Sequence, residues 1–104
     1  MAEHLVCATE DLASGSAQRF DIAGHRIAVA RVGDTFYAIG DRCSHEDFSL
    51  ALGEVDEENC EIECARHGAS FDLTTGAAMT FPATSPVASY AVTVLDGSVM
   101  VTLP

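Results

Sequence analysis

The sequence predicts an all-β protein, built as an antiparallel β-sandwich or a barrel-like stack of sheets. Short runs in which apolar and polar residues alternate recur along the 104 residues, and this alternation is typical of half-buried strands. Gly-containing two-residue turns join neighbouring runs, as they do in antiparallel hairpins. No helical period extends beyond about two turns. Because the length fits a single domain, its sheets are expected to pack on one another.

The N-terminal part predicts one strand followed by a three-strand antiparallel meander. The apolar, partly β-branched run 5–9 predicts the first strand, and the polar, Gly-containing segment 11–16 predicts a loop. The turns Ala23-Gly24 and Gly33-Asp34 then join three further predicted strands, at residues 17–22, 26–32 and 35–39. Within 26–32 one face carries Ile27, Val29 and Arg31, and the other carries Ala28, Ala30 and Val32.

The rest of the chain predicts short strands and a closing hairpin. Short strands are expected at residues 54–56, 60–64 and 69–73, and in the second of them Cys60, Ile62 and Cys64 are expected to point inward. The segment 82–86 predicts an ordered loop, because neither of its prolines can donate a hydrogen bond to a ladder. The closing hairpin is predicted to pair residues 90–95 with 98–103 across an Asp96-Gly97 turn.

Several further side chains, inside and outside these strands, are also expected to be buried. Phe48, Leu50 and Leu52 are expected to form the apolar underside of the loop after residue 40, or to complete the core. Met79 and Met100 are expected to fill the core, and Cys7 and Cys60 to behave as buried small hydrophobic residues. The sandwich is expected to pack around the aromatic residues Phe36, Tyr37 and Tyr90.

The chain is strongly acidic. Sixteen acidic residues against five basic ones give a formal charge of −11. Such a surface repels nucleic acid and anionic membranes and suits a basic docking partner, although solubility alone is an alternative reason for it. Half of the acidic residues lie between the two motifs described below, which favours electrostatic docking close to those motifs. They are Glu46, Asp47, Glu54, Asp56, Glu57, Glu58, Glu61 and Glu63.

Neither a membrane span nor an export signal is visible in the sequence. No apolar run approaches the roughly 18 residues of a bilayer-spanning helix. The N-terminus lacks a basic segment followed by an apolar one. We therefore expect a cytoplasmic protein without a membrane partner, and this compartment also argues against disulfides.

Two Cys/His pairs are the strongest chemical signal in the chain. Cys43-Ser44-His45 is followed, after eighteen residues, by Cys64-Ala65-Arg66-His67. Thiolate and imidazole ligands suit zinc or an iron–sulfur cluster better than a hard, oxygen-loving ion. The Cys-x-His pair is too short for the usual zinc loop, which places two to four residues between paired ligands. The spacing therefore favours a binuclear cluster.

The pattern Cys-x-His followed by Cys-x-x-His resembles the Rieske [2Fe–2S] motif, in which two His replace two Cys on one iron. The resemblance implies that Cys43 and Cys64 hold the inner iron of one such cluster, and that His45 and His67 hold the outer iron. Further positions that match the family follow the second pair and complete a resemblance over residues 43–86. They are Gly68, Phe71, Gly76, Pro82 and Pro86.

This resemblance implies both a fold and a function. A single domain, 1–104, would comprise a basal β-sandwich, about 1–39 and 83–104, and a cluster-binding subdomain, about 40–82, with two ligand loops and a proline loop. The chain is similar to the ferredoxin component of bacterial ring-hydroxylating dioxygenase systems. Such a component is a one-electron carrier from a flavin-containing NAD(P)H reductase to a terminal oxygenase, is not catalytic alone, and is expected to be monomeric.

The resemblance also implies a low reduction potential. High-potential Rieske proteins carry Ser and Tyr hydroxyls where this chain has Ala69 and Phe71, and a cross-link between the ligand loops where it has Arg66 and no second cysteine. Hydrogen bonds to sulfur stabilise the reduced cluster, so their loss lowers the potential. We expect a value of about −150 mV, at the low end of the Rieske range.

Other functions remain open at this point. Two are further Rieske roles, a small subunit of a nitrite reductase and an accessory ferredoxin for iron–sulfur assembly. A zinc-stabilised interaction module with Cys₂His₂ ligation and a metal-free sandwich belong to other classes. The chain is not expected to be the oxygenase, because only His4 and His25 remain for a second iron site. It lacks the Gly-x-Gly-x-x-Gly fingerprint of a nucleotide-binding reductase.

Overall fold

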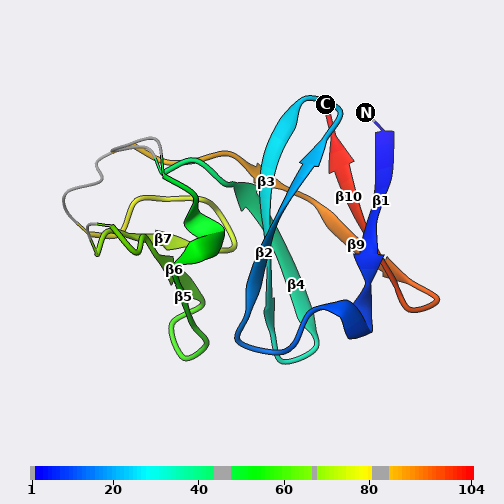
Figure 1. Ribbon diagram of the computed structural model, residues 1–104, viewed down its shortest axis with the longest axis horizontal. Helices are drawn as coiled ribbons and strands as arrows, with labels where there is room; N and C mark the ends of the chain where they lie inside the picture. Colours follow the sequence, from blue (N-terminus) through cyan, green and yellow to red (C-terminus); the bar gives the residue numbers. More distant parts are fainter. Residues whose placement is uncertain (1, 44–47, 67, 81–84) are drawn as a thin grey trace.

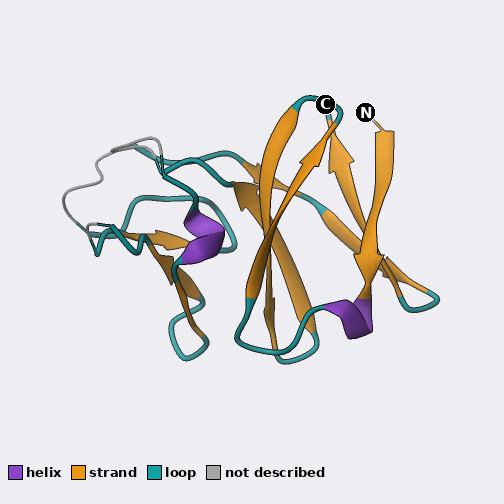
Figure 2. Ribbon diagram, viewed as in Figure 1, coloured by secondary structure: helices purple, strands orange, loops and turns teal. Residues whose placement is uncertain are grey.

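The computed structural model describes residues 2–43, 48–66, 68–80 and 85–104. Over these residues the chain forms strands and two single-turn 3₁₀ helices (Figure 2). The helices are η1 (Thr9–Asp11) and η2 (Leu50–Leu52). The strands are β1 (Ala2–Ala8), β2 (Ala17–Ile22), β3 (His25–Val32), β4 (Thr35–Gly40), β5 (Glu54–Asp56), β6 (Glu61–Glu63), β7 (Ser70–Asp72), β8 (Ser89–Tyr90), β9 (Val92–Leu95) and β10 (Ser98–Leu103).

Three antiparallel sheets lie side by side along the molecule (Figure 1). The central sheet has the order β2-β3-β4-β8, and the sheet β1-β10-β9 packs against one of its faces. The small sheet β5-β6-β7 lies on the other side, at the left of Figure 1. Each described pairing between strands is antiparallel, so the predicted all-β antiparallel fold is confirmed. No helix in the described residues is long and apolar enough to cross a bilayer.

Strand β3 separates two apolar cores. Its odd-numbered side chains Ile27 and Val29 are fully buried in the core shared with β10. Its even-numbered side chains Ala28 and Ala30 are equally buried, but in the core shared with the small sheet. A strand covered on both faces carries apolar residues at successive positions rather than a clean alternation. The predicted division of these residues between the two faces is therefore confirmed.

The predicted hairpins form in the expected register. Ile22 pairs with His25, Val32 with Thr35, and Leu95 with Ser98. At two of these turns a left-handed residue precedes a left-handed glycine, Ala23 with φ of 49° and Asp96 with φ of 51°. Two consecutive positive φ angles are those of a type I′ turn, whose twist matches that of the flanking strands.

The predicted strand 90–95 is wrong, because the chain changes sheet at Ala91. Tyr90 pairs with Ala38 of the central sheet, whereas β9, which begins one residue after Ala91, pairs with β10. The carbonyl of Ala91 accepts a hydrogen bond from Thr102 over 2.9 Å. The single run of alternating residues thus serves two sheets and joins them directly.

The first strand also differs from the prediction. It begins at Ala2 and ends at Ala8, and Thr9 already belongs to η1. The cause is local, since the Asp11 carboxylate accepts a hydrogen bond from the Ala8 N–H over 3.0 Å and starts the helical turn.

Some core predictions were wrong. Leu50 is fully buried, but Leu52, at the end of η2, is 69% exposed, and Met79 is 48% exposed. Tyr37 packs against the core beside the small sheet rather than in the sandwich. There a side-chain hydrogen bond with Cys60 raises the pKa of Tyr37. Cys60 is only partly buried and has a left-handed φ of 55°, which is why β6 begins one residue later than predicted.

Candidate metal centre

Cys43 and Cys64 enter the same apolar core from different strands. They are 1% and 0% exposed, and the core around them includes Leu50, Ile62 and Phe71. The four cysteines of the chain all lie in the described residues and form no disulfide. The fold thus brings two buried thiol groups, far apart in sequence, into one core, and their role as sulfur ligands stays a prediction.

The first ligand loop leaves the central sheet at the end of β4. The N–H of Cys43 donates a hydrogen bond to the carbonyl of Phe48 over 2.9 Å, and an antiparallel bridge joins Arg42 to Ser49. The apolar side chains of Phe48 and Leu50 then pack in the core that includes Cys43 and Cys64, which confirms their expected burial. Backbone contacts thus hold Arg42 and Cys43, at the start of the loop, against Phe48 and Ser49 at its end.

The second ligand loop leaves the small sheet at the end of β6. The N–H of Cys64 donates to the carbonyl of Ala69 over 2.7 Å, and the N–H of Gly68 donates to the carbonyl of Cys64 over 2.9 Å. Gly68 has a φ of +76°, a left-handed conformation that favours glycine. Ala69 and Phe71, the positions without a hydroxyl, are fully buried.

The stems of the two ligand loops pack backbone against backbone at Gly53. A Cβ placed on Gly53 would lie 1.7 Å from the carbonyl oxygen of Glu63, the residue before Cys64. Only a glycine permits this approach, and its φ of −87° shows that space rather than backbone conformation is the reason. This role of Gly53 could not be read from the sequence, because the close approach depends on tertiary packing.

Sequence reasoning missed Asp41, the one buried charged side chain in the described residues. Its Oδ1 accepts hydrogen bonds from Ser49 Oγ over 2.8 Å and from the Ala51 N–H over 2.9 Å. Its Oδ2 lies 3.6 Å from Arg26 Nη2 and 3.9 Å from Arg19 Nε. The signal that could have found it is a carboxylate directly after an apolar strand, two positions before a predicted ligand cysteine.

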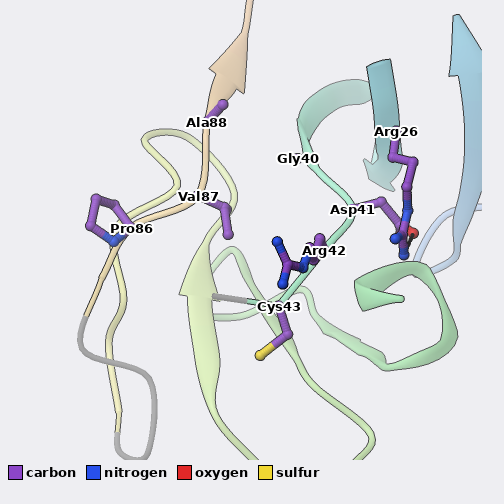
Figure 3. Close-up of a pocket in the computed structure, with 8 residues that line it drawn as sticks. All are labelled: Arg26, Gly40, Asp41, Arg42, Cys43, Pro86, Val87 and Ala88. Carbon is purple, nitrogen blue, oxygen red and sulfur yellow. Dashed lines mark ion pairs between the residues drawn. The ribbon is translucent and has the colours of Figure 1, made fainter. Parts of the chain in front are cut away.

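A cavity of about 280 Å³ opens beside Cys43 and is lined by residues 40–43 and 86–88 together with Arg26 (Figure 3). The Asp41 side chain points toward Arg26, whereas the Cys43 side chain points the other way. On the far wall, the N–H of Val87 donates to the carbonyl of Gly76 over 2.8 Å. Pro86 lines the same cavity as residues 40–43, while Pro82 falls outside the described residues.

The small sheet presents an acidic outer face. Glu54 pairs directly with Glu63, and Asp56 with Glu61, which in turn pairs with Asp72. Hydrogen bonds from Asn59 lower the pKa of Asp56, and hydrogen bonds from Thr74 lower the pKa of Asp72. Asp56 and Asp72 therefore stay ionised at neutral pH. Like charges directly opposite one another destabilise a sheet.

The predicted imidazole ligands, His45 and His67, lie outside the described residues, so the complete ligand set stays a prediction. The two cysteines fit the sulfur half of a mixed donor set, because both thiols are buried and both loops are closed by backbone hydrogen bonds. Thiolates select zinc or iron–sulfur centres, and a buried, water-poor setting suits a redox centre.

Comparison with known proteins connects this site to a family. The chain matches the Rieske [2Fe-2S] domain over residues 2–91. It is 39% identical over 103 residues to the 3-phenylpropionate/cinnamic acid dioxygenase ferredoxin subunit of Photorhabdus laumondii, covering 99% of this chain and 96% of that protein. The ferredoxin of carbazole 1,9a-dioxygenase from Nocardioides aromaticivorans IC177 superposes with a TM-score of 0.96 at 35% identity, covering 100% of both chains.

A second solved structure is a complex of reduced oxygenase and oxidized ferredoxin in carbazole 1,9a-dioxygenase. One of its chains matches with a TM-score of 0.89 and 39% identity, covering 96% of this chain and 92% of that chain.

Proposed function

This chain belongs to the Rieske [2Fe-2S] domain family, and from that we propose that it is the ferredoxin component of an aromatic-ring dioxygenase system. In this role it carries single electrons from a flavin-containing NAD(P)H reductase to a terminal oxygenase, and it has no catalytic activity alone. The observation that carries the proposal is the 39% identity, over 99% of this chain, to a protein named as a dioxygenase ferredoxin subunit. The match to a chain in an oxygenase–ferredoxin complex supports the oxygenase as the electron acceptor.

We propose Cys43, His45, Cys64 and His67 as the ligands of one Rieske-type [2Fe–2S] cluster, the two cysteines on one iron and the two histidines on the other. When bound, this cluster supplies a group that gains and loses one electron. The burial of Cys43 and Cys64 supports the assignment, because it excludes water from the sulfur side. The Cys43 and Cys64 N–H groups are already bonded within their own loops, so neither is left to donate to a sulfur atom.

The buried Ala69 and Phe71 support a low reduction potential, because neither side chain can donate a hydrogen bond to sulfur. We therefore propose a value of about −150 mV. A redox titration tests this, and a potential above zero would contradict the argument.

The acidic face of the small sheet suits a docking partner with a basic surface. Glu54, Asp56 and Glu63 are exposed on it, and complementary charge raises association rates without requiring tight binding. A carrier must dissociate quickly after each transfer, so we propose that it acts as a monomer. We place it in the cytoplasm, where cysteine thiols stay reduced. Within its single domain, we propose that residues of about 40–82 form the cluster-binding part.

Spectroscopy followed by reconstitution tests this function. The purified, iron-replete protein should be red-brown and contain iron and sulfide. The electron paramagnetic resonance spectrum of its dithionite-reduced form should have a lower average g-value than that of an all-cysteine [2Fe–2S] cluster. A colourless zinc protein would support the interaction module instead. In a stopped-flow assay, a dioxygenase-system reductase with NADH should reduce the protein, and the matching oxygenase should reoxidise it. A holo-protein that a nitrite reductase large subunit reoxidises instead would point to the alternative Rieske role.

A further inference from the structure

We propose that Asp41 is a positioning residue for the first ligand loop, and that its buried negative charge lowers the reduction potential of the site. This inference rests on the proposed function, because it concerns the same cluster. Its two parts, loop closure and charge, follow from different contacts and can be separated by different substitutions.

The closure part follows from the hydrogen bonds around Asp41. Its carboxylate Oδ1 receives the Ser49 hydroxyl and the Ala51 N–H, and its backbone carbonyl receives the Leu50 N–H over 2.6 Å. These three donors are consecutive residues at the far end of the loop that contains Cys43. Asp41, at the start of the loop, therefore holds residues 49–51, at its end, by three hydrogen bonds.

Asp41 also anchors this closed loop to the central sheet. Its N–H donates to the carbonyl of Arg26 on β3 over 3.1 Å, and its Oδ2 faces the Arg26 and Arg19 guanidinium groups. Figure 3 shows the Asp41 carboxylate and the Arg26 guanidinium side by side, on the side away from Cys43. The fully buried Asp41 side chain thus adds to the backbone contacts that hold Cys43 relative to the sheet.

The charge part follows from burial and proximity. Only Arg42 lies between Asp41 and Cys43 in the chain, so the Cα atoms of Asp41 and Cys43 lie no more than about 7 Å apart. The Asp41 side chain is 0% exposed, so solvent screens its charge poorly. A fixed negative charge near a centre that gains an electron disfavours the reduced state. Removing the Asp41 charge also leaves the positive charges of Arg26 and Arg19 less compensated. Both effects raise the reduction potential.

Two substitutions separate the parts. Asp41→Asn removes the charge but keeps an amide oxygen that can accept from Ser49 and Ala51. Asp41→Ala removes the charge and the acceptor together. Both variants should be prepared as holo-protein. The measurements are the midpoint potential by redox titration, the g-values by electron paramagnetic resonance, and the rate of iron loss to a chelator.

We expect Asp41→Asn to keep its cluster and to titrate at a higher potential than the parent protein. Asp41→Ala should lose iron about tenfold faster or more, the effect of losing two hydrogen bonds to a buried carboxylate. Asp34→Asn is the matched control, because Asp34 also faces an arginine, Arg31 at 3.4 Å, but its side chain is fully exposed. That control should change neither quantity.

An unchanged potential in Asp41→Asn overturns the charge part, and an unchanged rate of iron loss in Asp41→Ala overturns the closure part. Should Asp41→Ala not fold, Ser49→Ala replaces it, because it removes one of the two Oδ1 bonds and keeps the charge. It should accelerate iron loss while leaving the potential near the parent value. If the parent protein itself binds no iron and sulfide, the proposed function fails, which is a different result from either of these.

Discussion

The N–H of Cys64 donates a hydrogen bond to the carbonyl of Ala69 over 2.7 Å, and Cys43 makes the corresponding bond to Phe48 over 2.9 Å. In both ligand loops the cysteine is thus bonded to the residue five positions on. The loops differ in sequence and leave different sheets, yet they close in the same way. In each loop the cysteine is one of the two residues joined by this hydrogen bond. The proposed histidine ligand lies between those two residues in the sequence.

Replacing Cys43 by serine should abolish cluster binding, because a hydroxyl is a far poorer ligand for iron than a thiolate. The iron content per chain should fall from about two to near zero. Iron and acid-labile sulfide analysis measures this. Cys7→Ser is the matched control, since Cys7 lies on β1 and its pKa is raised, first by burial and then by Asp11. Loss of iron from the Cys7 variant as well would show that the effect is not specific to the site.

Replacing Gly53 by alanine should destabilise the protein by about 3 kcal/mol or more, because the added Cβ would collide with the Glu63 backbone. Gly68→Ala is a useful comparison. There the left-handed φ costs about 1 kcal/mol, but the nearest atom to the new Cβ is a flexible carboxylate oxygen 3.9 Å away. Denaturant unfolding of both variants gives the two free energies. A smaller loss for Gly53→Ala than for Gly68→Ala would contradict the packing of the two loop stems.

Replacing Glu54 by lysine should change stability and electron transfer in opposite directions. The new side chain would face Glu63 across the ladder, which turns a repulsive pair into an attractive one and adds about 0.2–1 kcal/mol of stability. The rate of electron transfer to a basic partner should fall severalfold at low salt and converge with the parent rate as salt screens the charges.

Thermal unfolding and stopped-flow kinetics measure the two effects of Glu54→Lys. Glu3→Lys makes the same charge change on β1, in the sheet at the other end of the molecule (Figure 1), and should leave the transfer rate nearly unchanged. Equal slowing by both variants would mean that net charge, and not the acidic face, controls docking.

Replacing Thr74 by valine should weaken the protein at neutral pH but not in acid. The Thr74 hydroxyl and N–H donate to Asp72 and lower its pKa below the usual 3.8. A depressed carboxyl pKa contributes stability that is present above 3.8 and is lost as the pH falls through the folded-state value. The difference between parent and variant, less than about 1 kcal/mol, should therefore shrink below pH 3.8.

Denaturant unfolding across this pH range tests the Thr74 prediction. Thr93→Val, on the exposed face of β9, is the control and should show no such pH dependence. A difference between parent and Thr74→Val that persists in acid would assign the effect to packing instead.

Much of the fold could be predicted because its determinants are local. Alternation of side chains and left-handed turn residues such as Ala23-Gly24 placed the hairpins in the correct register. The change of sheet at Ala91 could not be predicted, because a single alternating run does not show which neighbour each half pairs with. Leu52 was wrongly assigned to the core because hydrophobicity alone does not give the direction of a side chain at the end of a short helix.

The candidate site divides in the same way. Cys43 and Cys64 could be proposed from residue types and spacing, and the structure adds that both lie buried in one core, while their role as ligands stays a prediction. The roles of Asp41 and Gly53 could not be predicted. The burial of the Asp41 carboxylate and the lack of room for a Cβ at Gly53 both depend on residues far away in the sequence. The imidazole pair stays a prediction.

The two-sided burial of β3 has a consequence for how the molecule opens. Ile27 and Val29 belong to one core, and Ala28 and Ala30 belong to the other. Because both cores share β3, the unfolding of this strand disrupts both cores together. The amide protons of this strand should be the last to exchange with deuterated solvent, and their exchange should report the opening of the entire chain at once.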